Sequence, residues 1–161
     1  MAKVISILMN KGGVSKTETS LNLAYGLSVK GKKVLLIDMD PSSNATSVIL
    51  GLDNNLSEQG ASQYKELFDK YISEGQPRIL ACYEAMHEYL KQTTYKYDIH
   101  DVLEDQKLDL HEAIQKTRFE NLDLIPSSVA LSTTDIKLKG SINPYNRLRR
   151  AIQKVEDEYD F

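Results

Sequence analysis

The segment Asn10-Lys11-Gly12-Gly13-Val14-Ser15-Lys16-Thr17 decides the fold class of this 161-residue chain. An apolar run rich in β-branched residues (3–9) precedes it, and a stretch with helical periodicity (16–30) follows it. A second apolar run occupies residues 34–37. The glycine segment therefore reads as a turn between a buried strand and a helix. Strand, helix and second strand form a β-α-β unit, which favours an α/β fold with a mainly parallel sheet flanked by helices.

The residue types in this turn suit a phosphate-binding loop. Gly12 and Gly13 permit positive φ angles and a close approach of the backbone to a ligand. Lys16 can reach the β- and γ-phosphates of a nucleotide, and the hydroxyl of Thr17 can hold Mg²⁺. The N-terminus of the following helix adds its dipole. The sequence therefore predicts a phosphate site at residues 10–17.

The strict glycine pattern of such loops is not met, because Asn10 and Ser15 stand at the two anchoring glycine positions. A glycine turn that joins a strand to a helix without binding any ligand is therefore the alternative for this segment taken alone.

The second strand ends in two acids, Asp38 and Asp40, followed by Pro41. This places two carboxylates at the strand tip beside the glycine turn. Like charges repel at such a distance unless a cation is present. One acid can orient an attacking water and the other can hold a magnesium-bound water. The alternative is an Asp-Pro turn that only ends the strand.

Composition and charge exclude several classes of protein. The chain is 41% hydrophobic and 27% charged, and its formal net charge of −3 argues against a surface covered in basic nucleic-acid contacts. The single Cys82 excludes an internal disulfide framework, and one cysteine with three scattered histidines makes a poor zinc site. The apolar run at residues 4–9 is too short to span a membrane. We expect a cytoplasmic protein that does not bind membranes.

The remainder of the chain reads as one domain, 1–161. Residues 53–97 are more polar and helical in period, and residues 121–126 form an apolar run stopped by a proline. We expect helices within 53–97, a third strand at 121–126, a helix at 131–138 and a last helix starting near residue 144.

Two segments together resemble one family. Lys11-Gly12-Gly13-Val14-x-Lys16-Thr17 is similar to the deviant Walker A motif of the ParA/MinD superfamily, which is marked by the extra lysine at position 11. Asp38-x-Asp40-Pro41-x-x-Asn44-Ala45-Thr46 resembles the Walker A′ segment of its ParA/Soj branch. The resemblance continues through residues 101–103, 113–114, 121–127 and 159–161, and it is weakest across 53–97.

The resemblance implies a role for each matching residue. Lys16 and Asp40 would act in catalysis, with Lys11 reaching the phosphates of a partner subunit; Thr17, and Asp38 through a water, would hold Mg²⁺. The implied ATP-binding residues are Lys11, Gly12, Gly13, Val14, Ser15, Lys16, Thr17 and Glu18. Without the family, an exposed lysine beside a turn is the simpler interpretation of Lys11.

This sequence departs from the family pattern at two places. Ser15 replaces a glycine, and Ser42-Ser43 replace the usual Gln-Gly. If the loop follows the ordinary path, Ser15 takes a positive φ angle, which costs a serine about 1 kcal/mol. The alternative is a rearranged loop with a negative φ angle at Ser15.

The family would make this chain the N-terminal part of a P-loop ATPase that uses ATP and Mg²⁺ in segregating plasmid or chromosomal DNA. The implied partners are a second copy in an ATP-dependent sandwich dimer, a ParB-type centromere-binding adaptor and non-specific DNA, which implies a nucleoid-associated protein. In the family, Tyr159-Asp160-Phe161 leads into the Walker B strand, so we expect an incomplete sheet and little activity from residues 1–161 alone. A MinD-like or mobile-element positioning ATPase and a nucleotide-free scaffold are the alternatives.

Overall fold

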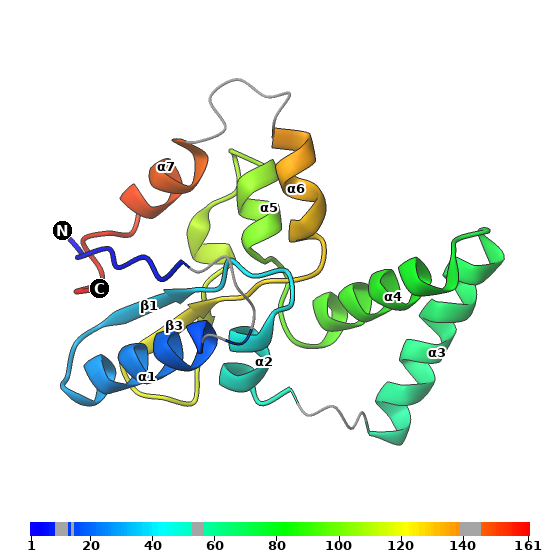
Figure 1. Ribbon diagram of the computed structural model, residues 1–161, viewed down its shortest axis with the longest axis horizontal. Helices are drawn as coiled ribbons and strands as arrows, with labels where there is room; N and C mark the ends of the chain where they lie inside the picture. Colours follow the sequence, from blue (N-terminus) through cyan, green and yellow to red (C-terminus); the bar gives the residue numbers. More distant parts are fainter. Residues whose placement is uncertain (9–12, 14, 53–56, 139–145) are drawn as a thin grey trace.

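The computed structural model is an α/β structure, and it describes residues 1–8, 13, 15–52, 57–138 and 146–161 (Figure 1). Its elements in chain order are α1 (Lys16–Val29), β1 (Val34–Ile37), α2 (Asn44–Leu50), α3 (Glu58–Ser73), α4 (Arg78–Thr93), α5 (Ile99–Glu104), the 3₁₀ turn η1 (Leu110–Glu112), β2 (Gln115–Lys116), β3 (Leu122–Ile125), α6 (Leu131–Leu138) and α7 (Arg147–Gln153). The α/β class expected from the sequence is confirmed.

The described residues form a three-stranded sheet in the order β1-β3-β2. β1 and β3 are parallel, with Val34 opposite Leu122 and Ile37 opposite Ile125. Both strands lie where the apolar runs predict them. The two-residue strand β2 pairs antiparallel with β3 and was not predicted, because a two-residue strand has too little pattern to be recognised.

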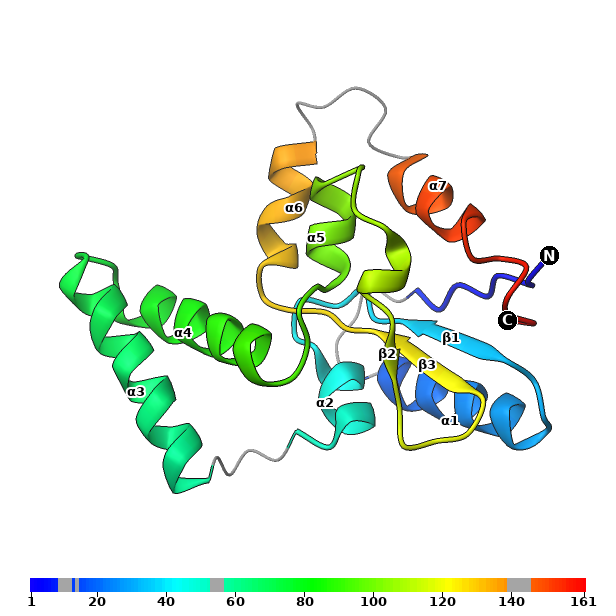
Figure 2. The same ribbon diagram turned by 180° about the vertical axis from the view of Figure 1, so that it is seen from behind.

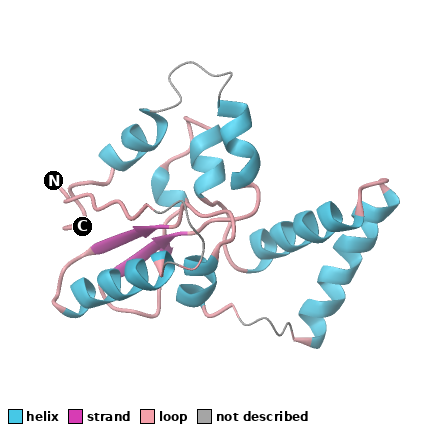
Figure 3. Cartoon of the chain, in the orientation of Figure 1, coloured by secondary structure: helices cyan, strands magenta, loops and turns pink. Residues whose placement is uncertain are grey.

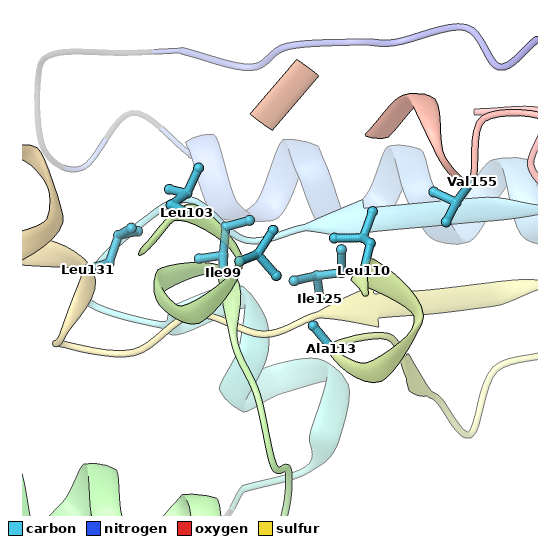
Figure 4. Close-up of a cluster of buried hydrophobic side chains, with 8 residues drawn as sticks. Ile99, Leu103, Leu110, Ala113, Ile125, Leu131 and Val155 are labelled. Carbon is cyan, nitrogen blue, oxygen red and sulfur yellow. The ribbon is translucent and has the colours of Figure 1, made fainter. Parts of the chain in front are cut away.

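Helices cover both faces of this sheet, as Figures 1 and 3 show. Successive side chains of a strand point to opposite faces, so each strand supplies both layers of the core. On one face, Ala24 of α1 and Ile49 of α2 pack with Val34, Leu122 and Leu124. The larger cluster on the other face is shown in Figure 4, and its buried residues are Ile99, Val102, Leu103, Leu110, Ala113, Ile125, Leu131 and Val155.

The predicted strand at residues 3–9 does not form over residues 3–8, and Met9 lies outside the described residues. The N–H of Lys3 instead donates to the carbonyl of Asp160 at 2.9 Å. On the opposite side, the N–H of Leu35 in β1 donates to the carbonyl of Phe161 at 3.0 Å. Asp160 and Phe161 therefore lie between the N-terminal segment and β1.

A groove of about 460 Å³ is lined by this N-terminal segment, β1 and α1. Val4, Ile5 and Leu8 remain exposed beside it, at 69%, 52% and 82% of their surface.

Helices α3 and α4 form a hairpin that projects from the body of the molecule (Figures 1 and 2). They lie within residues 53–97, where helices were expected, and pack mainly against each other. Helix α6 also lies where it was predicted, and α7 begins at Arg147, just after the expected start. Within the described ranges, no helix combines the length and apolar character that crossing a bilayer requires.

Candidate functional site

The carboxyl end of β1 and the first residue of α1 are joined by an ion pair. Nζ of Lys16 lies 2.5 Å from Oδ2 of Asp40, and each side chain is about one third exposed, at 34% and 30%. The hydrogen bond from Lys16, followed by those from Ser42, lowers the pKa of Asp40 from 3.8 to about 2. The lysine and the acid predicted to act together are therefore adjacent, although 24 positions separate them in the sequence.

The Oδ1 oxygen of Asp40 stabilises the turn in which Asp40 itself lies. Oδ1 accepts the backbone N–H of Ser42 at 3.0 Å and the Ser42 hydroxyl at 2.7 Å. An aspartate that accepts bonds from residues just after it is a common way to stabilise such a turn. Asp40 is thus fixed on one oxygen by the backbone and bound on the other by Lys16.

Asp38 is buried, with 5% of its surface exposed. Its Oδ1 accepts the N–H of Asp40 at 3.1 Å, and its Oδ2 accepts the N–H and the hydroxyl of Thr46 at 2.9 and 2.8 Å. The Thr46 hydroxyl in turn accepts the N–H of Ser127 at 2.9 Å. This set of bonds ties together the ends of β1 and β3 and the start of α2.

Helix α1 begins without a side-chain cap. Its N-cap residue, Ser15, has φ of 54° and ψ of 26°, and its hydroxyl makes no capping bond. The positive φ angle predicted for Ser15 is confirmed, and Gly13 also has a positive φ, of 72°. Thr17 and Glu18 lie in the first turn of α1. The second serine at a family glycine position behaves alike: Ser43, the N-cap of α2, has φ of 55°.

Three of the predicted site residues, Lys11, Gly12 and Val14, lie outside the described residues. Four of the other predicted residues share one surface, because Lys16, Thr17, Asp38 and Asp40 all line the 460 Å³ groove, whereas Ser15 and Glu18 do not line it. A hydroxyl and a carboxylate oxygen are ligand types that suit a hard cation such as Mg²⁺. Across the part of the chain that the structure describes, no group of three or more His, Cys, Asp or Glu residues is placed to hold a metal by itself.

Sequence reasoning assigned no role to Thr46 or Ser127. Thr46 is almost fully buried, at 1% exposure, and Ser127 is completely buried. A threonine eight residues after an aspartate carries only a weak signal for a hydrogen bond, and Ser127 is 81 positions from Thr46. Their connection depends on the sheet register, which no local pattern reveals.

Comparison with known proteins places this geometry in a family. A family model described as an AAA domain matches residues 2–161. The chain belongs to this family. Soj, the sporulation initiation inhibitor protein of Bacillus subtilis, is 34% identical over 161 residues, which cover 100% of the chain and 48% of Soj. A virulence plasmid ParA family protein of Chlamydia psittaci is 30% identical, covering 98% of the chain and 46% of that protein.

The solved structures give the same picture of this AAA domain. The septum site-determining protein MinD of Pyrococcus horikoshii, complexed with Mg-ADP, is 25% identical with a TM-score of 0.58. The match covers 100% of the chain and 47% of MinD. The chain is thus an N-terminal portion of a ParA/MinD-type ATPase, and it spans about half the length of the curated relatives it matches.

Proposed function

We propose that this AAA domain binds ATP with Mg²⁺ at the start of α1 and hydrolyses it as part of a partition protein. The observation that carries the proposal is the Lys16–Asp40 pair at the uncapped N-terminus of α1. Backbone N–H groups at such a terminus are free to bind an anion, and the helix dipole favours negative charge there. Lys16 adds a full positive charge at the same place.

Each polar residue then has a defined task. Lys16 binds the β- and γ-phosphates, for which it exchanges its contact with Asp40. Asp40, released from Lys16 and still held by Ser42, orients the water that attacks the γ-phosphate. Thr17, and Asp38 through a water, would hold Mg²⁺, which neutralises charge developing on the phosphate oxygens.

The cellular role rests on the relatives. Soj and the Chlamydia psittaci protein support a partition ATPase of the ParA branch. We propose that the whole protein acts in plasmid or chromosome segregation as an ATP-dependent sandwich dimer, with Lys11 reaching the partner's phosphates, a ParB-type adaptor and non-specific DNA as further partners. Sedimentation of a Lys11→Ala variant with ATP tests the dimer, because a normal ATP-bound dimer would contradict this role of Lys11.

A positioning ATPase of the MinD kind is the second candidate. It is favoured by the likeness to MinD and by a 29% identical cell division protein, PomZ of Myxococcus xanthus. ATP-dependent binding of the whole protein to DNA or to anionic lipid vesicles separates the two, because the partition proposal expects DNA alone to be bound.

We also propose that residues 1–161 alone have little ATPase activity. β1 pairs with β3 along one of its edges, and its other edge faces the groove and residues 2–8. Among the described residues, the Asp38–Asp40 turn is therefore supported by a complete strand pair on one side only. Efficient magnesium-dependent turnover by these residues alone would contradict this.

Replacing Asp40 by alanine tests the proposed chemistry. We expect ATP binding to be kept or strengthened and hydrolysis to fall at least about 100-fold, because a water-positioning acid acts mainly in the transition state. Calorimetry measures the first and phosphate release the second. Asp69→Ala, on the exposed surface of α3, is the matched control. A normal hydrolysis rate in Asp40→Ala would remove Asp40 from the mechanism, and absence of ATP binding in the parent protein would favour the scaffold alternative.

A further inference from the structure

A buried network of hydrogen bonds links three segments that are distant in sequence. Asp38 follows β1, Thr46 is in α2 and Ser127 comes after β3. Their exposed fractions are 5%, 1% and 0%. Ser127 takes part through its backbone N–H, and its buried hydroxyl has no hydrogen-bond partner among the described residues. Burial makes each hydrogen bond of the network costly to lose, so the bonds constrain the groups that form them.

The hydroxyl of Thr46 is the centre of this network. The N–H of Ser127 can only donate, so the Thr46 oxygen accepts it at 2.9 Å. The single hydroxyl proton is then directed to Oδ2 of Asp38 at 2.8 Å. A hydroxyl that both donates and accepts a hydrogen bond is held in one rotamer. The Thr46 hydroxyl therefore also fixes the orientation of the Asp38 carboxylate to which it donates.

Counting acceptor positions shows what remains at Asp38. A carboxylate offers about four lone-pair positions. The N–H of Thr46 and its hydroxyl take both positions on Oδ2, and the N–H of Asp40 takes one on Oδ1. Among the residues that the structure describes, about one position, on Oδ1, is left for another donor.

We propose that Thr46 is a positioning residue, which fixes Asp38 so that the remaining acceptor position on Oδ1 receives a magnesium-bound water. This inference rests on the proposed function, since it concerns the Mg²⁺ that accompanies the nucleotide. Thr46 itself touches neither metal nor nucleotide. Residues that orient a metal site from outside its immediate ligands commonly change metal affinity 10- to 100-fold when they are replaced.

A set of variants in the whole protein tests the role of the hydroxyl. Thr46→Val keeps the shape and the backbone N–H but removes the hydroxyl, whereas Thr46→Ser keeps it. The measurement is ADP binding by calorimetry across a series of Mg²⁺ concentrations, with a parallel series in EDTA. We expect Thr46→Val to need about 10-fold more Mg²⁺ for half-maximal enhancement of ADP binding. Thr46→Ser should stay within about twofold of the parent, and binding in EDTA should be unchanged in both.

Thr134 provides a matched control. It is as buried as Thr46, at 1% exposure, and its hydroxyl lies 2.7 Å from Nδ1 of His100, in a different part of the fold. Thr134→Val should lose stability without changing the Mg²⁺ dependence. If Thr46→Val and Thr134→Val change the Mg²⁺ dependence equally, Thr46 has only a structural role.

Two further outcomes are separable. If the parent protein binds ADP with no Mg²⁺ dependence, the result contradicts the proposed function, and it does not contradict the hydrogen bonds between Thr46 and Asp38. If the parent shows the dependence and Thr46→Val keeps it unchanged, the positioning role is wrong. Should Thr46→Val not fold, Thr46→Cys replaces it, because a thiol of similar size is a weak donor. The Cys variant should need more Mg²⁺ than the Ser variant, and equal values would overturn the proposal.

Discussion

The N-termini of α1 and α5 are built in opposite ways. At α5, Asp98 accepts the N–H of Asp101 at 3.2 Å, and Asp101 accepts the N–H of Asp98 at 2.9 Å, which is a reciprocal capping box. At α1, Ser15 adopts a left-handed conformation and its side chain caps nothing. The start of α5 is thus capped by side chains of the protein, whereas the start of α1 has no side-chain cap.

What sets the α1 start apart is its left-handed N-cap, because α4 also begins without a side-chain cap, at Pro77 with φ of −59°. Under the proposed function, this left-handed start belongs to the ligand site and the α5 start is structural. A side-chain cap contributes about 1 kcal/mol, and a left-handed serine costs about 1 kcal/mol. Helix α1 lacks the stabilisation of a side-chain cap and has the cost of a left-handed serine, directly beside Lys16. Helix α2 repeats this pattern, since Ser43 is also left-handed and provides no cap. Both uncapped starts adjoin the Asp38–Asp40 turn, which is where the proposed ligand binds.

The largest effect is expected at the uncapped helix. Lys16→Ala should weaken ATP binding at least about 100-fold, because the charge-assisted contact of this lysine with the phosphates is lost. Calorimetry with Mg-ATP measures the loss. Lys30→Ala, at the opposite end of the same helix, is the control and should bind normally. Equal affinities for both variants would place the nucleotide somewhere other than the start of α1.

At the capped helix the expected effect is on stability. Asp98 is completely buried and is bonded to His87 at 3.2 Å. Asp98→Asn should lower the free energy of unfolding by about 2 kcal/mol, because an uncharged amide oxygen replaces the buried carboxylate oxygen that is bonded to His87. Urea unfolding measures this loss. Mg-ATP affinity of the folded variant should equal that of the parent, and a large loss of affinity would end the distinction between the two helix starts.

The same variant has a predictable pH dependence. Burial opposes the ionisation of Asp98, but the hydrogen bond from His87 and the charge of Lys91 outweigh it and hold its pKa at about 2, against an ordinary 3.8. A carboxyl group whose pKa is lower in the folded protein stabilises the fold fully at any pH above its ordinary pKa. This stabilisation is lost as the pH falls from the ordinary pKa through the lowered pKa. The stability difference between parent and Asp98→Asn should therefore shrink between about pH 4 and pH 2. A constant difference across this range would contradict the assignment.

The smallest effect concerns the conformation of the serine. Ser15→Gly should raise the free energy of unfolding by up to about 1 kcal/mol, because glycine adopts φ of 54° without the cost that serine has there. ATP affinity should change less, because Ser15 has this φ without any ligand. Ser57→Gly is the matched opposite case: Ser57 has φ of −56° and accepts the N–H of Gly60, so this change should cost a few tenths of a kcal/mol in stability. Weaker ATP binding by Ser15→Gly would show that the Ser15 hydroxyl itself contacts the phosphates.

Much of this fold could be predicted from local sequence. The apolar run at 34–37 marks β1 without error, and the resemblance to a glycine position anticipates the positive φ of Ser15. The closeness of Lys16 and Asp40 was expected from the β-α-β interpretation, and it holds although the first strand of that unit does not form over residues 3–8. These features depend on neighbours in the chain, or on one well-understood connection.

What could not be predicted depends on distant partners. Residues 3–8 have the composition of a buried strand, yet the backbone hydrogen bond described for them is the one from Lys3 to the distant Asp160. The bond between Thr46 and Ser127 and the pair of His87 with Asp98 likewise require the sheet and the helices to be in place first. Side-chain patterns report burial and period, and they do not report which distant group lies opposite.

The most direct test of the central claim is to observe both helix starts during one titration. Backbone amide NMR signals of the protein are followed as Mg-ADP is added. We predict large chemical-shift changes at Lys16, Thr17 and Glu18, where the N–H groups receive the phosphates, and negligible changes at Ile99 and Asp101, in the first turn of the capped helix α5. Saturating Mg-ADP that leaves the α1 signals unmoved, or moves those of α5 as far, would contradict the account.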